Sequence, residues 1–356
     1  MTSERRGHIH PSQLGTVPVR ASELQAKPVD WLWPGRVPRG ALTVLAGEPG
    51  LGKSLLSIQL ASALSRGELG GEAAESLVLT AEDSHEHTVL PRLVAAGADL
   101  GRIVFPPPAN DGLEGAIRIP DDVSYLGHLV ERTQASLVVV DPLVAYLPMK
   151  VNSWQDQSLR GALAPLAGLA RERGVAVLLI AHLNKGRDAD PLRRLGGSIG
   201  LAAAARSLLL LARDPDDPDG VNGARRVLAH AKSNLGVLAP SLAFRIETAS
   251  LEDEVASAYL EPAGTSRFSA AELLALNEAE ARSKLSEAEA LLRAELGDGP
   301  RPVSELRTAA HELGISITTL ERAKKQVGAR SDKLDLNRWV WYLPRTEASE
   351  DEAAAA

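Results

Sequence analysis

The sequence predicts an α/β protein, in which a mostly parallel β-sheet is covered by helices, extended by antiparallel strands and followed by a small, mainly helical module. Three observations predict this fold class. Short apolar runs alternate with helical patterns from residue 41 to residue 212, two more runs follow with only turns between them, and the composition shifts to Ala, Glu and Leu near residue 266. Alternating strands and helices are typical of parallel sheets, and closely spaced strands are typical of hairpins.

The first expected strand, at 41–46, precedes a glycine-rich loop and the pattern "KSLLSIQLASALSRG", which we expect to form an amphipathic helix. A second helix, "SLRGALAPLAGLARERG", follows a buried strand at 136–142. The other expected strands are apolar runs that end in polar or turn residues, at 76–83, 102–105, 175–186, 206–212, 225–231 and 240–247. The last three lie too close together for crossover helices, so we expect them to form antiparallel hairpins.

Composition excludes several classes of protein. The chain of 356 residues has no cysteine, which excludes disulfides and thiolate metal sites and fits the cytoplasm. We expect no signal peptide, because the amino-terminal sequence has no apolar stretch, and no membrane span, because no later apolar run approaches ~18 residues. The net charge is −7, yet Pro300–Arg345 has nine Lys or Arg against five Asp or Glu, and Thr346–Ala356 has four acids and no base. The acidic total therefore conceals a basic carboxyl-terminal module.

These shifts in composition predict five segments. We expect a flexible amino-terminal arm over 1–28, a large α/β domain over 29–265 and a helical linker over 266–285. A small module over 286–345 follows, with two helices separated by the turn "LGIS" and a final strand at "WVWYLP", and 346–356 forms an acidic, disordered tail.

The stretch "AGEPGLGKSLL" at 46–56 carries the clearest chemical signal, because it fits the pattern G-x-x-x-x-G-K-[ST]. In such a loop backbone N–H groups and a helix amino terminus face phosphate oxygens. Lys53 then reaches the β- and γ-phosphates and the Ser54 hydroxyl binds Mg²⁺. The position between an expected strand and helix argues against a chance match. The predicted ATP-binding residues are Gly47, Glu48, Pro49, Gly50, Leu51, Gly52, Lys53, Ser54 and Leu55.

Polar side chains end three other apolar strands, where ligands bind in open α/β sheets. Asp141 ends "LVVVD" and is a candidate to hold Mg²⁺ through water, although an Asp before a proline also starts turns. Glu82 ends "LVLTAE" and is the candidate base for an attacking water, with Asp83 as its competitor. His182 ends "VAVLLIAH" and is either a γ-phosphate sensor or an ordinary interior histidine.

Together these positions resemble the RecA-like hexameric P-loop ATPases, in particular the DnaB/RepA-type replicative helicases. The resemblance rests on "WLWPGRVPRGALTVLAGEPGLGKS", "LTAED", "VVVDPL", "LLIAHLNKG", "RRLGGSIGLAAAARSLLLLARDPDD" and "HAKSNLG", and covers roughly Trp31 to Glu247. It implies a hexameric ring with ATP between subunits, Lys53 and Ser54 as phosphate and Mg²⁺ ligands, and the roles above for Glu82, Asp141 and His182.

The resemblance also implies that a cation enters the neighbouring subunit's site. Arg206 in "AAAARS" matches the arginine in this position, although an ion pair within the subunit is the simpler interpretation. DnaB-type enzymes carry Lys-x-Arg on a late strand, whereas here Lys232 is followed by Asn234, which supplies no cation. Lys232 remains a candidate contact for the neighbour's phosphate, so the trans-acting role falls to Arg206 or to Lys232.

Two regions are candidate DNA contacts. In the resembled family the loops after Asp141 and His182 hold single-stranded DNA, and here the second loop contains Lys185, Arg187, Arg193 and Arg194, which are otherwise ordinary solvated charges. The carboxyl-terminal module resembles a winged helix-turn-helix whose second helix carries Thr319, Arg322, Lys324 and Lys325. Such a helix reads the major groove, although winged helices also bind proteins.

The leading interpretation is an ATP- and Mg²⁺-dependent ring motor that translocates on or unwinds DNA, as a replicative helicase of a mobile element. Its partners would be single-stranded DNA, double-stranded DNA through the winged helix, and copies of itself in a hexamer. The alternative is a DNA-bound regulatory or recombination-mediator ATPase without processive unwinding. A small-molecule P-loop kinase is a third interpretation, opposed by the late hairpin strands and the basic module.

Overall fold

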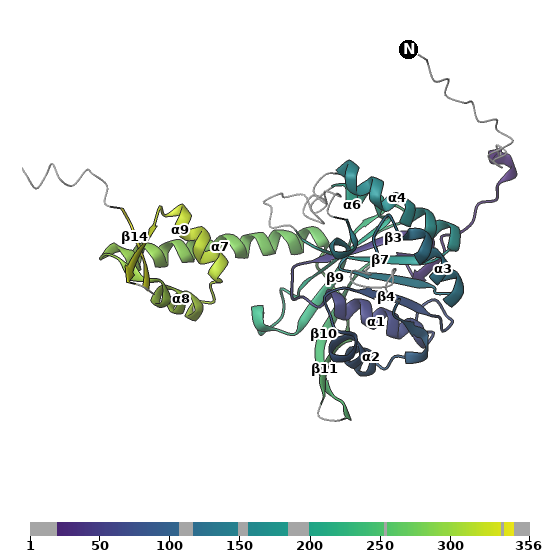
Figure 1. The fold of residues 1–356 in the computed structure, drawn as a ribbon, viewed down its shortest axis with the longest axis horizontal. Helices are drawn as coiled ribbons and strands as arrows, with labels where there is room; N and C mark the ends of the chain where they lie inside the picture. The colour runs from purple at the N-terminus through teal and green to yellow at the C-terminus, as the bar shows by residue number, and fades with distance from the viewer. Residues whose placement is uncertain are drawn as a thin grey trace, which may run out of the picture.

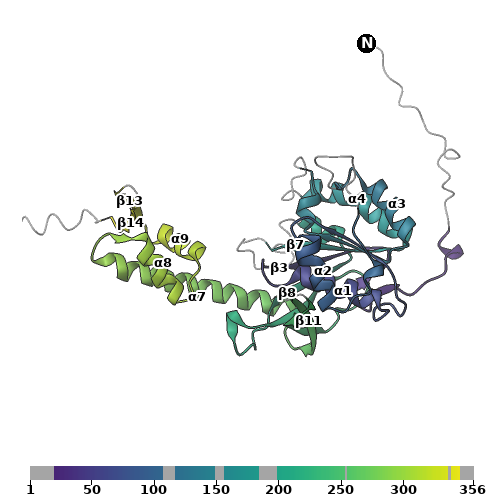
Figure 2. The same ribbon diagram turned by 60° about the horizontal axis from the view of Figure 1, so that its bottom comes forward.

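The computed structural model describes residues 20–106, 117–148, 156–183, 199–252, 255–335 and 338–344. Within these residues a nine-stranded sheet has the strand order β11-β10-β9-β8-β3-β7-β6-β4-β5. Helices cover both of its faces, and a smaller module lies at the far end of a long helix (Figures 1 and 2). The predicted arm at 1–28 is described from residue 20 onward, and the predicted tail at 346–356 lies outside the described residues.

Six strands make the parallel part of the sheet: β3 (Leu42–Gly47), β4 (Ser76–Thr80), β5 (Ile103–Val104), β6 (Leu137–Asp141), β7 (Ala176–His182) and β8 (Ser207–Arg213). Their Val-, Leu- and Ile-rich sequences suit strands that are buried on both faces. β3 lies between β7 and β8, so the loop after β3 emerges near the middle of the sheet.

The antiparallel extension consists of β9 (Arg225–Ser233), β10 (Ser241–Ser250) and β11 (Ala256–Ser266). The expected mostly parallel sheet with added antiparallel strands is therefore confirmed. Sequence analysis missed β11, because this edge strand is largely exposed, contains Pro262 and Gly264, and lacks a regular apolar alternation. Proline within a sheet is confined to edges and bulges, and the pairing register shifts here, between Leu242 and Phe244 of the partner strand.

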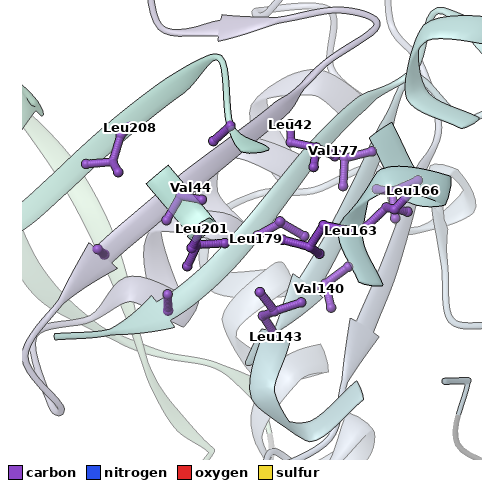
Figure 3. Close-up of a cluster of buried hydrophobic side chains, with 14 of the residues drawn as sticks. Leu42, Val44, Val140, Leu143, Leu163, Leu166, Val177, Leu179, Leu201 and Leu208 are labelled. Atoms are coloured by element: carbon purple, nitrogen blue, oxygen red, sulfur yellow. The ribbon is translucent and has the colours of Figure 1, made fainter. Parts of the chain in front are cut away.

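Two apolar cores lie on opposite faces of the sheet. One packs the sheet against α3 (Val123–Thr133), α4 (Asp156–Arg173) and α6 (Ile199–Ala204), and Figure 3 shows Leu163 and Leu201 beside the strand residues Val44 and Leu179. The other packs it against α1 (Lys53–Ser65) and α2 (Leu90–Ala95). The expectation that α1 is amphipathic is wrong, because its residues are buried on most sides. This helix contacts α2 and the edge strand β11 as well as the central strands of the sheet.

Short elements complete this domain. A hairpin of β1 (Trp31–Trp33) and β2 (Val37–Pro38) precedes β3. Single turns occur at Ala21–Glu23, Leu100–Arg102, Leu143–Tyr146 and Gly220–Asn222 as 3₁₀ helices and at His85–Val89 as a π-helix. No helix in the described parts of the chain is both long enough and apolar enough to cross a membrane.

The carboxyl-terminal module begins within α7 (Ala270–Gly297), which starts at a capping box formed by Ser269 and Glu272. The first turns of α7 join the domain core through Leu273, whereas its last turns join a separate core through Leu292. Thus one helix spans the predicted linker and the start of the predicted module. The remaining elements are β12 (Arg301–Pro302), α8 (Val303–Glu312), α9 (Ile317–Gln326), β13 (Arg330–Asp335) and β14 (Arg338–Tyr342), with the sheet order β12-β14-β13.

Candidate functional site

Within the described residues, a pocket of about 520 Å³ lies where β3, β4, β6 and β7 end. Its size falls in the range of small-molecule sites, ~300–1,000 Å³. It brings together the carboxyl-edge residues that sequence analysis selected from four separate strands. Its lining consists of Pro49, Gly50, Gly52, Lys53, Ser54, Leu55, Glu82, Asp83, Arg92, Asp141, Ile180, His182, Ile246 and Ala258.

The glycine-rich loop turns sharply between β3 and α1. Gly50 and Gly52 have φ angles of 77° and 92°, which side-chain-bearing residues rarely adopt. The Lys53 side chain folds back along the loop, and its Nζ donates to the carbonyl oxygens of Gly47 at 3.0 Å and Glu48 at 2.8 Å. Burial lowers the pKa of Lys53 to about 8, against the opposing effect of Asp141, Glu48 and Glu82. These carboxylates therefore keep a buried ammonium group charged near neutral pH.

Ser54 and Asp141, the two predicted Mg²⁺ contacts, lie together. The Ser54 hydroxyl donates to the Asp141 carboxylate, while burial, with Asp83 and Glu82 nearby, raises the pKa of Asp141 to about 6. A hydroxyl and a carboxylate side by side fit Mg²⁺, which binds one or two protein oxygens and otherwise phosphates and water. Among the described residues no group of three or more His, Cys, Asp or Glu side chains suits a metal.

Glu82 and Asp83 have different surroundings in the structure. Oδ2 of Asp83 lies 2.7 Å from Nη1 of Arg92, so the Asp83 carboxylate is already engaged in a salt bridge. Glu82 is exposed in the pocket and acts electrostatically on Lys53, Asp141 and His182. Its position thus suits a general base better than that of its neighbour.

His182 is the last residue of β7 and pairs in register with Gly47 of β3. Burial lowers its pKa below the ordinary value, Lys53 lowers it further, and Glu82 partly offsets both effects. The ring is therefore neutral at pH 7 and can donate a hydrogen bond from one nitrogen while the other accepts. The next residue, Leu183, donates its N–H to the Gly47 carbonyl at 3.2 Å, which ties the end of β7 to the loop.

Four lining residues escaped sequence analysis: Arg92, Ile180, Ile246 and Ala258. Ile246 on β10 and Ala258 on β11 reach the pocket from the antiparallel extension, and a Cβ on Gly52 would lie 3.6 Å from Cδ1 of Ile246. The available signal was weak, because Ile246 is only the last apolar residue of "SLAFRIE" and β11 was not expected.

Arg206 and Lys232 lie at the opposite edge of the sheet, which is the end where the parallel strands begin. Ser207 pairs with Thr43 near the start of β3, so Arg206 lies five residues, or about 16 Å, from the level of Gly47. Arg206 is exposed. Nζ of Lys232 donates to the carbonyl of Ala205 at 3.1 Å and also to that of Ala202. Neither cation lines this chain's own pocket.

The candidate DNA contacts divide into two groups. Lys185, Arg187, Arg193 and Arg194 lie outside the described residues. On α9, Arg322 and Lys325 are exposed, whereas Lys324 Nζ lies 4.5 Å from the ring centroid of Trp341 and donates to Ser331. The Thr319 hydroxyl lies 2.9 Å from that of Ser316, which caps α9. Arg322 and Lys325 are thus the two α9 candidates that face solvent.

Parts of the chain are similar in sequence to known proteins. The family model of the AAA domain, AAA_25, matches residues 9–188, just over half of the chain. The DNA repair protein RadA of Bacillus subtilis (strain 168) is 26% identical over 153 residues, which are 42% of this chain and 30% of RadA. The chain therefore matches less than a third of that relative.

Three solved structures are also similar. They are the ATPase domain of G40P (17% identity, 58% of this chain and 82% of that chain, TM-score 0.44), the RadB recombinase (19%, 59% and 88%, 0.42) and a KaiC-like protein from Pyrococcus horikoshii OT3 (17%, 65% and 100%, 0.45).

Proposed function

The chain belongs to the AAA domain family AAA_25 and contains a RecA-like P-loop ATPase domain, and from this premise we propose that it is an ATP-hydrolysing ring motor that translocates on or unwinds DNA. The biological role we propose is that of a replicative helicase of a mobile element. One observation carries the proposal: a pocket with phosphate-binding, acidic and histidine groups lies at one sheet edge, and two further cations lie at the other.

In this proposal the carboxyl edge performs hydrolysis. Lys53 and the backbone N–H groups of the loop bind the β- and γ-phosphates, and Ser54 and Asp141 would hold Mg²⁺, which neutralises charge on the phosphates. Glu82 orients a water molecule and accepts its proton, because its carboxylate is exposed in the pocket, whereas that of Asp83 is held in a salt bridge with Arg92. His182 donates a hydrogen bond to the γ-phosphate.

The opposite edge supplies the trans-acting cation. Arg206 and Lys232 are too far from their own loop, so they serve the ATP site of a neighbouring copy, and a hexameric ring would repeat this contact. Backbone N–H of Asn234, the position where the resembled helicases carry a second cation, donates to the Arg206 carbonyl at 2.9 Å. This proximity supports Arg206 as the substitute for the missing side chain.

The carboxyl-terminal module adds a duplex contact. Its order of helix, strand, two helices and two strands supports a winged helix, and its exposed Arg322 and Lys325 lie on the helix that would enter the major groove. Single-stranded DNA would bind through the loop that contains Lys185, Arg187, Arg193 and Arg194.

A second candidate function is a regulatory or recombination-mediator ATPase that assembles on DNA without unwinding it. The match to RadA, named as a DNA repair protein, favours this candidate.

The steady-state ATPase rate with and without single-stranded DNA, together with the mass of the assembly with ATP, tests the proposal. Stimulation by DNA in a hexamer, followed by unwinding of a forked duplex, is the expected result. Stimulation without unwinding would favour the recombination mediator, and a DNA-indifferent rate in a monomer or dimer would favour the regulatory ATPase.

A further inference from the structure

Arg226, on β9, contacts the middle of the phosphate loop although it is 175 residues away in the sequence. Its side chain is buried, with 6% exposure. Nε donates to the Leu51 carbonyl at 3.2 Å, and Nη1 donates to the carbonyls of Gly223 and Arg225 at 2.8 Å each. Sequence analysis assigned no role to this residue.

The contact with Leu51 has a geometric consequence inside the pocket. A trans peptide is planar, so its C=O and its N–H point in opposite directions. The carbonyl of Leu51 and the N–H of Gly52 belong to one peptide, and Gly52 lines the pocket. A guanidinium that holds the Leu51 carbonyl therefore also fixes the direction of the Gly52 N–H, which points to the opposite side of the same peptide.

The surroundings of Arg226 indicate that packing alone does not explain it. Arg226 pairs in register with Arg213 across β8 and β9, and like charges in direct opposition destabilise a sheet. Burial and Arg213 both lower the pKa of Arg226, and Asp217 only partly offsets them. An apolar residue would avoid these costs at this position, because a buried charge is unfavourable unless its hydrogen bonds compensate for lost water.

We propose that Arg226 is a positioning residue, which fixes the peptide between Leu51 and Gly52 so that the loop presents an N–H to the nucleotide phosphates. This role rests on the proposed ATPase function. It also means that β9 supports the chain's own nucleotide site at its first residues and carries Lys232 near its other end.

Substitution of Arg226 by Met keeps the length and the apolar part of the side chain but removes all three donated hydrogen bonds. We expect the dissociation constant and the KM for ATP to rise at least ~10-fold, the loss typical of a charged hydrogen-bond donor, with a smaller fall in kcat. Arg226→Lys keeps a donor within reach of Leu51 and should recover part of the affinity.

Arg225→Met is the matched control. The Arg225 guanidinium pairs with Asp214 at 3.0 Å instead of contacting the loop, so its loss should lower the unfolding midpoint while the dissociation constant stays within ~2-fold of the unaltered value. Nucleotide-free hydrogen exchange gives a second readout that does not need activity. We expect the peptide containing the Gly52 amide to exchange faster in Arg226→Lys and Arg226→Met than in the control.

A folded Arg226→Met variant with unchanged ATP affinity and unchanged exchange in the loop would overturn the positioning role. If Arg226→Met does not fold, the same two measurements on Arg226→Lys decide, and unchanged values would again overturn it. If the unaltered protein does not bind ATP, the proposed function is overturned. The role of Arg226 in positioning the loop for ATP is then overturned as well.

Discussion

The two edges of the central sheet carry different kinds of polar residue. At the carboxyl edge, Lys53, Asp141 and Glu82 act on one another inside one pocket of a single chain. At the opposite edge, Arg206 is exposed and the Lys232 ammonium bonds to backbone carbonyls, away from that pocket. One edge gathers its polar groups within a single chain, whereas under the proposed function the cations of the other edge act on a second molecule.

The largest expected effect is at the carboxyl edge. Lys53→Ala should reduce ATP hydrolysis at least ~1,000-fold, because the proposed function gives the buried ammonium the task of compensating charge on the phosphates. Phosphate release measures the rate, and circular dichroism confirms that the variant is folded. Near-normal turnover would refute the role of the loop and with it the difference between the edges.

A slightly smaller effect is expected at the opposite edge. Arg206→Ala should lower kcat by about 1,000-fold, as the loss of a trans-acting arginine does, while ATP binding remains unchanged because the chain's own pocket is intact. Equilibrium binding of ATP and single-turnover hydrolysis separate these two quantities.

A mixture of the two variants distinguishes a trans-acting role from an ion pair within the subunit. In a mixed assembly some interfaces combine the intact Lys53 of one variant with the intact Arg206 of the other. Equal amounts of Lys53→Ala and Arg206→Ala should therefore recover measurable activity that neither shows alone. If the mixture is as inactive as its components, Arg206 acts within its own subunit and the edges are not complementary.

The carboxyl edge could be predicted from sequence because its residues obey local rules. An apolar strand that ends in Asp141, or two residues before Glu82, places that carboxylate at the edge where parallel strands end, whatever the rest of the fold does. The ranges of β3, β6 and β8 agree closely with the predicted runs for the same reason.

The features that sequence analysis missed depend on contacts between segments that are distant in the sequence. Ile246 reaches the pocket only because β10 pairs with an edge strand that has little apolar pattern. The bond from Arg226 to Leu51 depends on the register of β9, and no local spacing indicates it. The burial of α1 depends likewise on β11, so its sequence alone suggests a half-exposed helix.

A moderate effect, on duplex binding, is expected in the carboxyl-terminal module, which is part of neither edge of the sheet. Replacing Arg322 and Lys325 by Ala should weaken duplex binding roughly 10-fold or more at low salt and flatten its salt dependence, because exposed cations bind phosphates. Lys324→Ala is the control, since this side chain contacts Trp341 and Ser331. Anisotropy with a labelled duplex measures binding. Equal losses in both variants would assign the effect to module stability, and a changed DNA-independent ATPase rate would show that hydrolysis is not confined to the two edges.

The smallest expected effect concerns the stability of the nucleotide-free protein, where the edges should respond in opposite directions. The pKa of Asp141 is raised from 3.8 to about 6, so the folded state binds more protons than the unfolded chain between these values and the ionised carboxylate destabilises the fold above them. Asp141→Asn should therefore stabilise the protein by about 1–3 kcal/mol at pH 7.5 and by little near pH 4.

Lys232→Met should destabilise the protein by about 1 kcal/mol, because two carbonyls lose their donor. Denaturant unfolding with a metal chelator measures both variants. A gain for Asp141→Asn that is equal at both pH values would mean that the benefit does not arise from relief of a buried charge, and the predicted contrast between the two edges would fail.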